Sequence, residues 1–175
     1  AASGVKCSIG LHPWYLDAHL KQMDELCHYA SLPNVLAIGE CGLDKICKTP
    51  WDMQLLAFNQ QIRLATTLGK PLIIHCVRAF GELLHIIKTE KPTVPVIVHG
   101  FSRNARIASQ LQDAGMYLSF GAAILNDNSP AVAALRQVSS SKFLPNVWNK
   151  LIVSLAQVPD LLTVHCTAVS IFLSQ

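Results

Sequence analysis

Four polar residues, His12, Glu40, His75 and His99, each follow a different short apolar run of the chain. Such runs, bounded by turn residues, predict buried β-strands, and the strands of a parallel sheet all end at the same edge. We therefore expect the four side chains to converge on one face of the fold. Imidazole and carboxylate groups are ligands that Zn²⁺ and Mn²⁺ accept, and three or four could hold an ion with a position open for water. For each residue taken alone, the alternative is an ordinary hydrogen-bonded structural role.

The most specific local pattern is GECGLD at residues 39–44. Its glycines permit unusual backbone angles and close backbone approach, and the Glu40 carboxylate could bridge two cations. Asp44 could orient a metal ligand or simply begin a loop. Arg78, three residues after His75, could clamp a phosphate group or form a surface salt bridge.

Apolar runs alternate with amphipathic stretches over most of the chain. The predicted strands cover residues 6–11, 35–38, 72–74, 94–98 and 116–120, and the predicted helices cover residues 14–30, 50–68, 79–88, 104–114 and 129–138. This alternation indicates βαβ units and a parallel sheet. The predicted strands are apolar throughout, which fits strands that are covered on both faces. Two architectures remain open at this point: an open doubly wound sheet and a closed (β/α) barrel.

The helix predicted after the GECGLD segment has the clearest boundaries. Thr49 is expected to cap it, Pro50 fits its first turn, and Asp52 lies three residues after the cap. Gly69 is expected to end the helix, and Pro71 prevents the chain from resuming it.

The composition is unusually apolar, because hydrophobic residues make up 51% of the chain and charged residues only 14%; about 25% charged is usual. The formal net charge of +3 is too small to indicate nucleic-acid binding on its own, although it leaves a phosphate-rich substrate open. The six cysteines form no C-x-x-C pair, and the chain is long enough to fold without disulfides. We therefore expect reduced thiols and a cytoplasmic location, and the first residues lack the pattern of a signal peptide.

The pattern of strands and helices fails from Ser139 onward. Residues 151–173 are long enough for a membrane span, but Pro159, Asp160 and His165 lie within them, and we expect no membrane association. We divide the chain into a barrel-like domain at residues 1–142 and an atypical segment at residues 143–175. Our hypothesis is that this segment is non-native sequence, produced by a shift of reading frame near Ser139.

Four segments together resemble the TatD family of metal-dependent hydrolases and deoxyribonucleases. They are IGLHP at residues 9–13, IGECGLD at 38–44, LIIHC at 72–76 and VHGFS at 98–102. Their order and spacing fit the family over residues 5–142. The amino-acid sequences of the motifs are most similar to those of a branch found in Bacteroidetes-like bacteria. The resemblance implies a TIM-type (β/α) barrel with a centre of one or two divalent ions, Mg²⁺, Mn²⁺ or Zn²⁺.

The resemblance also implies roles for single residues. Glu40 would bridge the metals, His75 and His99 would ligate one of them, and His12 would lie on the substrate side, with Arg78 as a further substrate contact. The expected substrate is DNA or another phosphodiester, and no stable protein partner is inferred.

Two of the family's metal-binding motifs are missing from the printed sequence: an initial His-x-His pair and a late Glu-Thr-Asp type motif. We therefore expect a barrel truncated at both ends, with five or six βα units. The alternative function is a catalytically impaired homologue that at most binds metal.

Overall fold

The computed structural model describes residues 7–16, 19–137 and 143–145. Within them, six strands form one sheet: β1 (Cys7–Ile9), β2 (Val35–Asp44), β3 (Leu72–Val77), β4 (Val96–Val98), β5 (Tyr117–Phe120) and β6 (Phe143–Pro145). The helices are α1 (His19–Ala30), α2 (Trp51–Leu68), α3 (Phe80–Glu90), α4 (Ala105–Asp113) and α5 (Pro130–Gln137), with short 3-10 turns at η1 (Pro13–Tyr15) and η2 (Ala122–Leu125).

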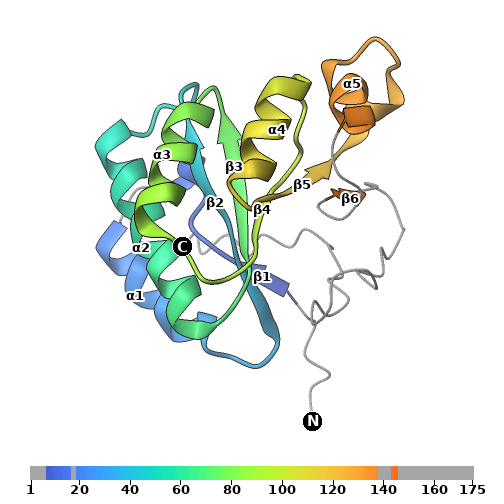
Figure 1. Ribbon diagram of the computed structural model, residues 1–175. Helices are drawn as coiled ribbons and strands as arrows, with labels where there is room; N and C mark the ends of the chain where they lie inside the picture. Colours follow the sequence, from blue (N-terminus) through green and yellow to red (C-terminus); the bar gives the residue numbers. More distant parts are fainter. Residues whose placement is uncertain (1–6, 17–18, 138–142, 146–175) are drawn as a thin grey trace.

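The strand order distinguishes the two architectures that the sequence leaves open. All neighbouring strands are parallel, and the order β1-β2-β3-β4-β5-β6 follows the chain without reversal. Each helix contacts the next helix along the chain, so the helices form one row against the sheet (Figure 1). A doubly wound sheet would reverse its strand order and place helices on both faces. The six units therefore form part of the wall of a TIM-type barrel, which confirms the predicted fold class.

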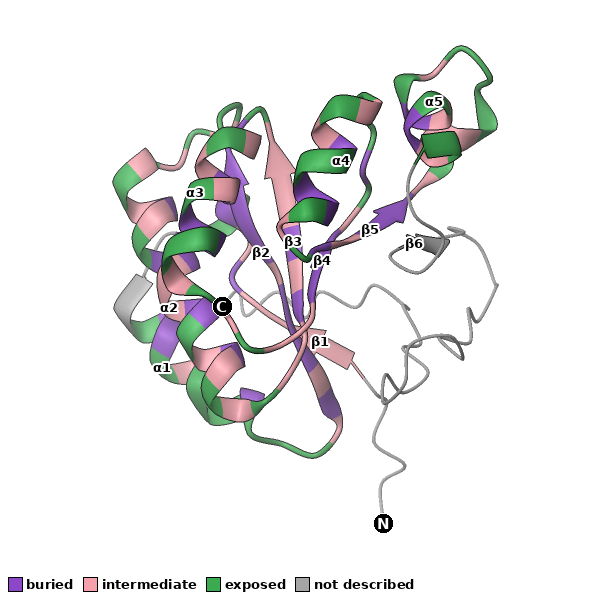
Figure 2. Cartoon of the chain, viewed as in Figure 1, coloured by how far each residue is buried: buried purple, intermediate pink, exposed green. Residues whose placement is uncertain are grey.

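The core lies between the sheet and this row of helices (Figure 2). On α2, Phe58, Ile62 and Ala65 are buried at the spacing of one helix face. Phe101 packs edge-on against Phe120, with ring centroids 5.5 Å apart. This burial explains the high apolar content, because strands covered on one side by helices and on the other by side chains of the barrel interior carry few charges.

Two predicted helix boundaries are wrong. The single helix expected over residues 14–30 is two elements: η1 ends at Tyr15, its C-cap Leu16 has extended backbone, and α1 is a separate helix that begins at His19. The N-cap of α2 is Pro50 and not Thr49, and it makes no side-chain capping hydrogen bond. The predicted end is confirmed, since Gly69 has the left-handed φ of 63° and its backbone N–H donates to the last turn.

The second and third strands are longer than their apolar runs. β2 continues through the GECGLD segment and pairs with β3 as far as the Asp44–Val77 pair. Glu40 and His75 therefore lie inside strands, and the expectation that each follows a strand end is wrong for both. The reason is that backbone pairing continues wherever a neighbouring strand is available, even where the side chains become polar.

The segment assigned to residues 143–175 begins with β6, which pairs with β5. Its remaining residues, including the stretch considered as a membrane span, lie outside the described residues, and so does the proposed frame shift. Among the helices that the structure describes, none is both long enough and apolar enough to cross a membrane.

Candidate metal centre

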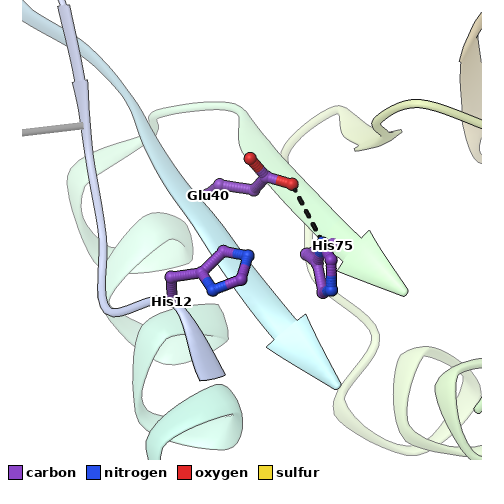
Figure 3. Close-up of side chains that lie close together, drawn as sticks. All are labelled: His12, Glu40 and His75. Carbon is purple, nitrogen blue, oxygen red and sulfur yellow. Dashed lines mark hydrogen bonds and ion pairs between the residues drawn. The ribbon is translucent and has the colours of Figure 1, made fainter. Parts of the chain in front are cut away.

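Three residues from neighbouring parts of the sheet lie together: His12 after β1, Glu40 in β2 and His75 in β3 (Figure 3). Each offers one ligand atom, and these atoms all lie within 4.8 Å of one another. All three residues are partly buried. The structure therefore brings together two imidazoles and one carboxylate that are far apart in the sequence.

Glu40 is positioned by an irregularity in β2. The register of β2 against β3 shifts between Ile38 and Cys41, so the strand carries a bulge at Glu40. Bulges re-aim a side chain relative to a regular strand. Gly39 makes the bulge possible, because a Cβ atom there would lie 2.3 Å from the carbonyl oxygen of Ile73. Only glycine lets β2 approach β3 this closely.

His12 is positioned by a buried glutamine on α2. The Gln61 side chain accepts a hydrogen bond from Leu11 N at 2.7 Å and donates one to Leu11 O at 3.1 Å. Gly10 lies so close to β2 that a Cβ atom there would be 2.6 Å from the Cα atom of Gly39. His12 itself caps η1, since its Nδ1 accepts from Trp14 N at 3.2 Å. That bond occupies Nδ1 and leaves Nε2 as the nitrogen available to a ligand.

His75 lies between two carboxylates. Its Nδ1 is 3.2 Å from Glu40 Oε1, and its Nε2 is 2.8 Å from Asp44 Oδ2. The His12 and His75 rings are tilted against each other with their centroids 4.4 Å apart. These contacts leave His75 little rotational freedom and direct one ring nitrogen toward the cluster.

The pKa values of the two imidazoles in the cluster are shifted in opposite directions. Burial and the neighbouring His75 lower the pKa of His12 to about 4, so His12 is uncharged at neutral pH. Burial alone would lower the pKa of His75, but the hydrogen bonds to Glu40 and Asp44 outweigh it and the pKa is raised. Burial would raise the pKa of Glu40, but the hydrogen bond from His75 and the electrostatic influence of the neighbouring imidazoles outweigh it and lower the pKa, so Glu40 is ionised.

This donor set fits a divalent cation. Two imidazole nitrogens and one carboxylate oxygen are the ligands found in three-residue catalytic zinc sites, which keep a fourth position open. The ionised Glu40 supplies negative charge, and the uncharged His12 supplies a lone pair.

The other two predicted site residues, His99 and Arg78, are not members of this cluster. His99 directly follows β4, where its backbone N–H donates to Ile74 O at 2.8 Å, and it is not one of the three grouped residues. Its side chain still acts electrostatically on Glu40 and His12. Arg78 is exposed directly after β3, in a left-handed backbone conformation with a φ of 55°. None of the ion pairs among the described residues includes Arg78.

Three supporting residues were not identified from the sequence: Trp14, Gln54 and Gln61. Trp14 donates its indole N–H to Asp44 Oδ2 at 2.7 Å, and Gln54 bonds both backbone groups of Asp44. The two glutamines could have been identified from their positions in the sequence. They are seven residues apart on the buried face of α2, which is otherwise apolar, and a polar side chain there needs an internal partner.

Comparison with known proteins identifies the family of this chain. The family model described as TatD related DNase matches residues 1–145. An uncharacterized metal-dependent hydrolase of Buchnera aphidicola is 30% identical over 143 residues, which are 81% of this chain and 52% of that protein. A 3'-5' ssDNA/RNA exonuclease TatD of Erwinia billingiae is 41% identical over 76 residues, which are 42% of this chain and 29% of that protein.

The fold has a solved counterpart in the TatD homologue YJJV from Escherichia coli. The two chains match with a TM-score of 0.69 and 26% identity, over 78% of this chain and 55% of that chain. The chain spans about half the length of the first curated relatives that it matches. Because the family model covers residues 1–145, from the first strand to the last, the chain belongs to the family of TatD-related DNases, as the four sequence segments indicated.

Proposed function

We propose that this chain carries a metal site of a hydrolase that cleaves phosphodiester bonds in DNA or a related nucleic acid. The observation that supports this most directly is the grouping of His12, Glu40 and His75, whose ligand atoms all lie within 4.8 Å of one another. The matched relatives are named as metal-dependent hydrolases and as an exonuclease of single-stranded DNA and RNA. A cluster of this kind in such a family is better explained by metal binding than by packing alone.

Glu40 and His75 belong both to the ligand set that the resemblance implies and to the observed cluster. We assign the first ion to these two residues together with His12. His99 is kept as a candidate ligand of a second ion, because it acts electrostatically on the Glu40 carboxylate that the two ions would share. In this assignment His12 is a ligand and not a substrate contact.

A divalent ion held at this position would lower the pKa of a water molecule and polarise a phosphoryl oxygen. The protein residues supply the arrangement. Glu40 is ionised and His12 is uncharged at neutral pH, so both are in the protonation state that a cation requires. Their anchoring through the β2 bulge and through Gln61 keeps the ligands in place before an ion arrives.

Arg78 is proposed as a contact to the substrate backbone. It is exposed and lies three residues beyond His75 along the chain. A guanidinium group matches a phosphate with two parallel hydrogen bonds and remains charged at any physiological pH. Arg78→Ala is accordingly expected to raise KM for an oligonucleotide more than it lowers kcat.

Calorimetric titration of the metal-free chain with Zn²⁺ or Mn²⁺, followed by hydrolysis of a labelled single-stranded oligonucleotide, tests the proposal. Glu40→Gln keeps the size and removes the charge, and it should weaken binding more than the roughly 10–100-fold loss typical of outer-shell changes. The matched control is Glu82→Gln, because Glu82 is a half-exposed carboxylate paired with Lys45. Equal binding by wild type and Glu40→Gln would refute the metal site.

The histidine variants separate the two ligand assignments. His12→Gln should weaken the first ion if His12 is a ligand, whereas His99→Gln should leave the first ion in place and affect only a second one. Binding of metal by the wild type without any turnover would support the alternative of an impaired homologue that at most binds metal.

We further propose a cytoplasmic location. The described cysteines, Cys7, Cys27, Cys41, Cys47 and Cys76, are all free thiols, as expected in a reducing compartment. Neither a membrane association nor a stable protein partner is part of this proposal.

A further inference from the structure

Asp44 lies at the end of β2 and gathers three hydrogen-bond donors. Its Oδ2 accepts from His75 Nε2 at 2.8 Å and from Trp14 Nε1 at 2.7 Å. Its Oδ1 accepts from Ile46 N at 2.7 Å. The side chain is only 2% exposed, so these donors take the place of water around the carboxylate.

The backbone of Asp44 is held as firmly as its side chain. Gln54 Oε1 accepts from Asp44 N at 2.8 Å, and Gln54 Nε2 donates to Asp44 O at 3.1 Å. Gln54 is itself buried on α2. Gln54 therefore fixes the backbone of Asp44, and the donors from Trp14 and Ile46 fix its carboxylate. Together these bonds make the carboxylate a rigid acceptor for His75.

We propose that Asp44 is a positioning residue that fixes the tautomer of His75. Its carboxylate holds the proton on Nε2, so that the lone pair of Nδ1 faces Glu40, where the ion would lie. This inference rests on the proposed function, because it concerns the ion held by His12, Glu40 and His75. Asp44 is not assigned as a ligand, since both of its oxygens already accept hydrogen bonds.

His75 has a second carboxylate within reach, and the two carboxylates differ in their distance from the ring and in their exposure to solvent. Glu40 Oε1 is 3.2 Å from Nδ1, whereas Asp44 Oδ2 is 2.8 Å from Nε2. The Glu40 side chain is 25% exposed and can be solvated, but Asp44 at 2% cannot. Removing the proton from Nε2 would leave a buried carboxylate oxygen facing a nitrogen lone pair, which is the more costly arrangement. The neutral imidazole therefore keeps its proton on the Asp44 side.

Nitrogen-15 NMR of the metal-free wild-type chain tests this directly, at a pH where His75 is neutral. The shifts of the two ring nitrogens should report a protonated Nε2 and an unprotonated Nδ1. A protonated Nδ1, or an equal mixture of the two tautomers, would overturn the proposal without any variant being needed.

Asp44→Asn adds a second test. Asparagine has the same size but no charge and only one acceptor oxygen, so it holds the proton on His75 Nε2 less strongly than the carboxylate does. The variant should shift His75 toward the mixed tautomer and lower the affinity for Zn²⁺ by roughly 10–100-fold. Asp52→Asn is the matched control, because it makes the same change at an exposed carboxylate in the first turn of α2. Its tautomer and its zinc affinity should stay close to those of the wild type.

The two readouts separate this inference from the proposed function. A wild type that binds no Zn²⁺ would refute the proposed function, while the NMR tautomer would still decide whether Asp44 controls His75. A folded Asp44→Asn variant with an unchanged tautomer and unchanged zinc affinity would overturn the role of Asp44 while leaving the metal site standing. If Asp44→Asn does not fold, the wild-type spectrum decides alone.

Discussion

Substituting alanine for Gly42 is expected to push β2 away from β3 at the point where these strands position the candidate ligands. Gly42 is buried and pairs with His75 in the sheet. A Cβ atom at this position would lie 2.1 Å from the carbonyl oxygen of His75, and the neighbour is backbone, which cannot rotate away. The φ of Gly42 is also +138°, a conformation that L side chains rarely adopt.

Two terms contribute to the expected loss of stability. Forcing a side chain into a sparsely populated backbone region costs about 1–3 kcal/mol. Inserting a methyl group into a packed interior costs about 1–3 kcal/mol more. The sum is roughly 2–6 kcal/mol, a large part of the about 5–15 kcal/mol by which a typical domain is stable. Relief of the overlap would move His75 relative to Glu40, so metal affinity should fall as well.

Urea denaturation of the metal-free chain, followed by circular dichroism, measures the first effect, and zinc titration measures the second. The matched control is Gly81→Ala on α3, where an added Cβ atom meets nothing within 4 Å and the residue is exposed. That variant should equal the wild type or gain about 0.5–1 kcal/mol, because alanine suits a helix better than glycine. A Gly42→Ala chain within about 0.5 kcal/mol of the wild type would refute the argument, since this is the range of neutral surface changes.

Two further predictions concern His12 and its support. Gln61→Leu leaves the buried N–H and C=O of Leu11 without their partners. At about 1–3 kcal/mol for each unsatisfied group, the loss measured by urea denaturation should be roughly 2–6 kcal/mol. Gln60→Leu, on the same helix, removes a side-chain oxygen with no partner among the described residues and should cost little; equal losses in both variants would contradict the role of Gln61. The pKa of His12 is lowered to about 4 in the folded chain. As the pH falls below about 6.5, the unfolded-state pKa, His12 binds a proton in the unfolded chain but not in the folded chain. The free energy of unfolding of the metal-free chain therefore decreases until the pH has fallen through about 4. Solvent screening at this partly buried site keeps that loss below the about 3 kcal/mol that the full pKa shift would give. The loss should be missing in His12→Gln, and parallel pH profiles of the two chains would show that His12 is not buried in this way.

Much of the fold was predictable from local pattern. The alternation of apolar runs and amphipathic stretches placed five of the six strands and the main helices, since hydrophobic periodicity reports which side of an element is buried. Gly69 was correctly predicted to end α2, because a left-handed residue at a helix end is a local requirement. The four segments of the resemblance were sufficient to identify the family, which the match over residues 1–145 confirms.

The start of α2 and the extent of β2 were less predictable. A threonine before Pro50 suggests a cap, but the Thr49 carbonyl instead accepts from Gln54 Nε2, and the helix begins without a side-chain cap. β2 extends beyond its apolar run because β3 is available to pair with it. Pairing between strands is a long-range contact and leaves no periodic signal in either segment by itself.

The sequence by itself determined the residue types that a metal site needs, the succession of elements that carries them, and the family. Only the tertiary structure decided which of them meet. His12 joins Glu40 and His75 because Gln61, fifty residues away from Leu11, holds its loop, and because three backbones approach closely at glycines. His99 remains outside this group although it follows its strand as predicted. The physical reason is that a ligand set depends on distances of a few ångströms, and these are set by register, bulges and buried polar contacts between segments that are distant in sequence.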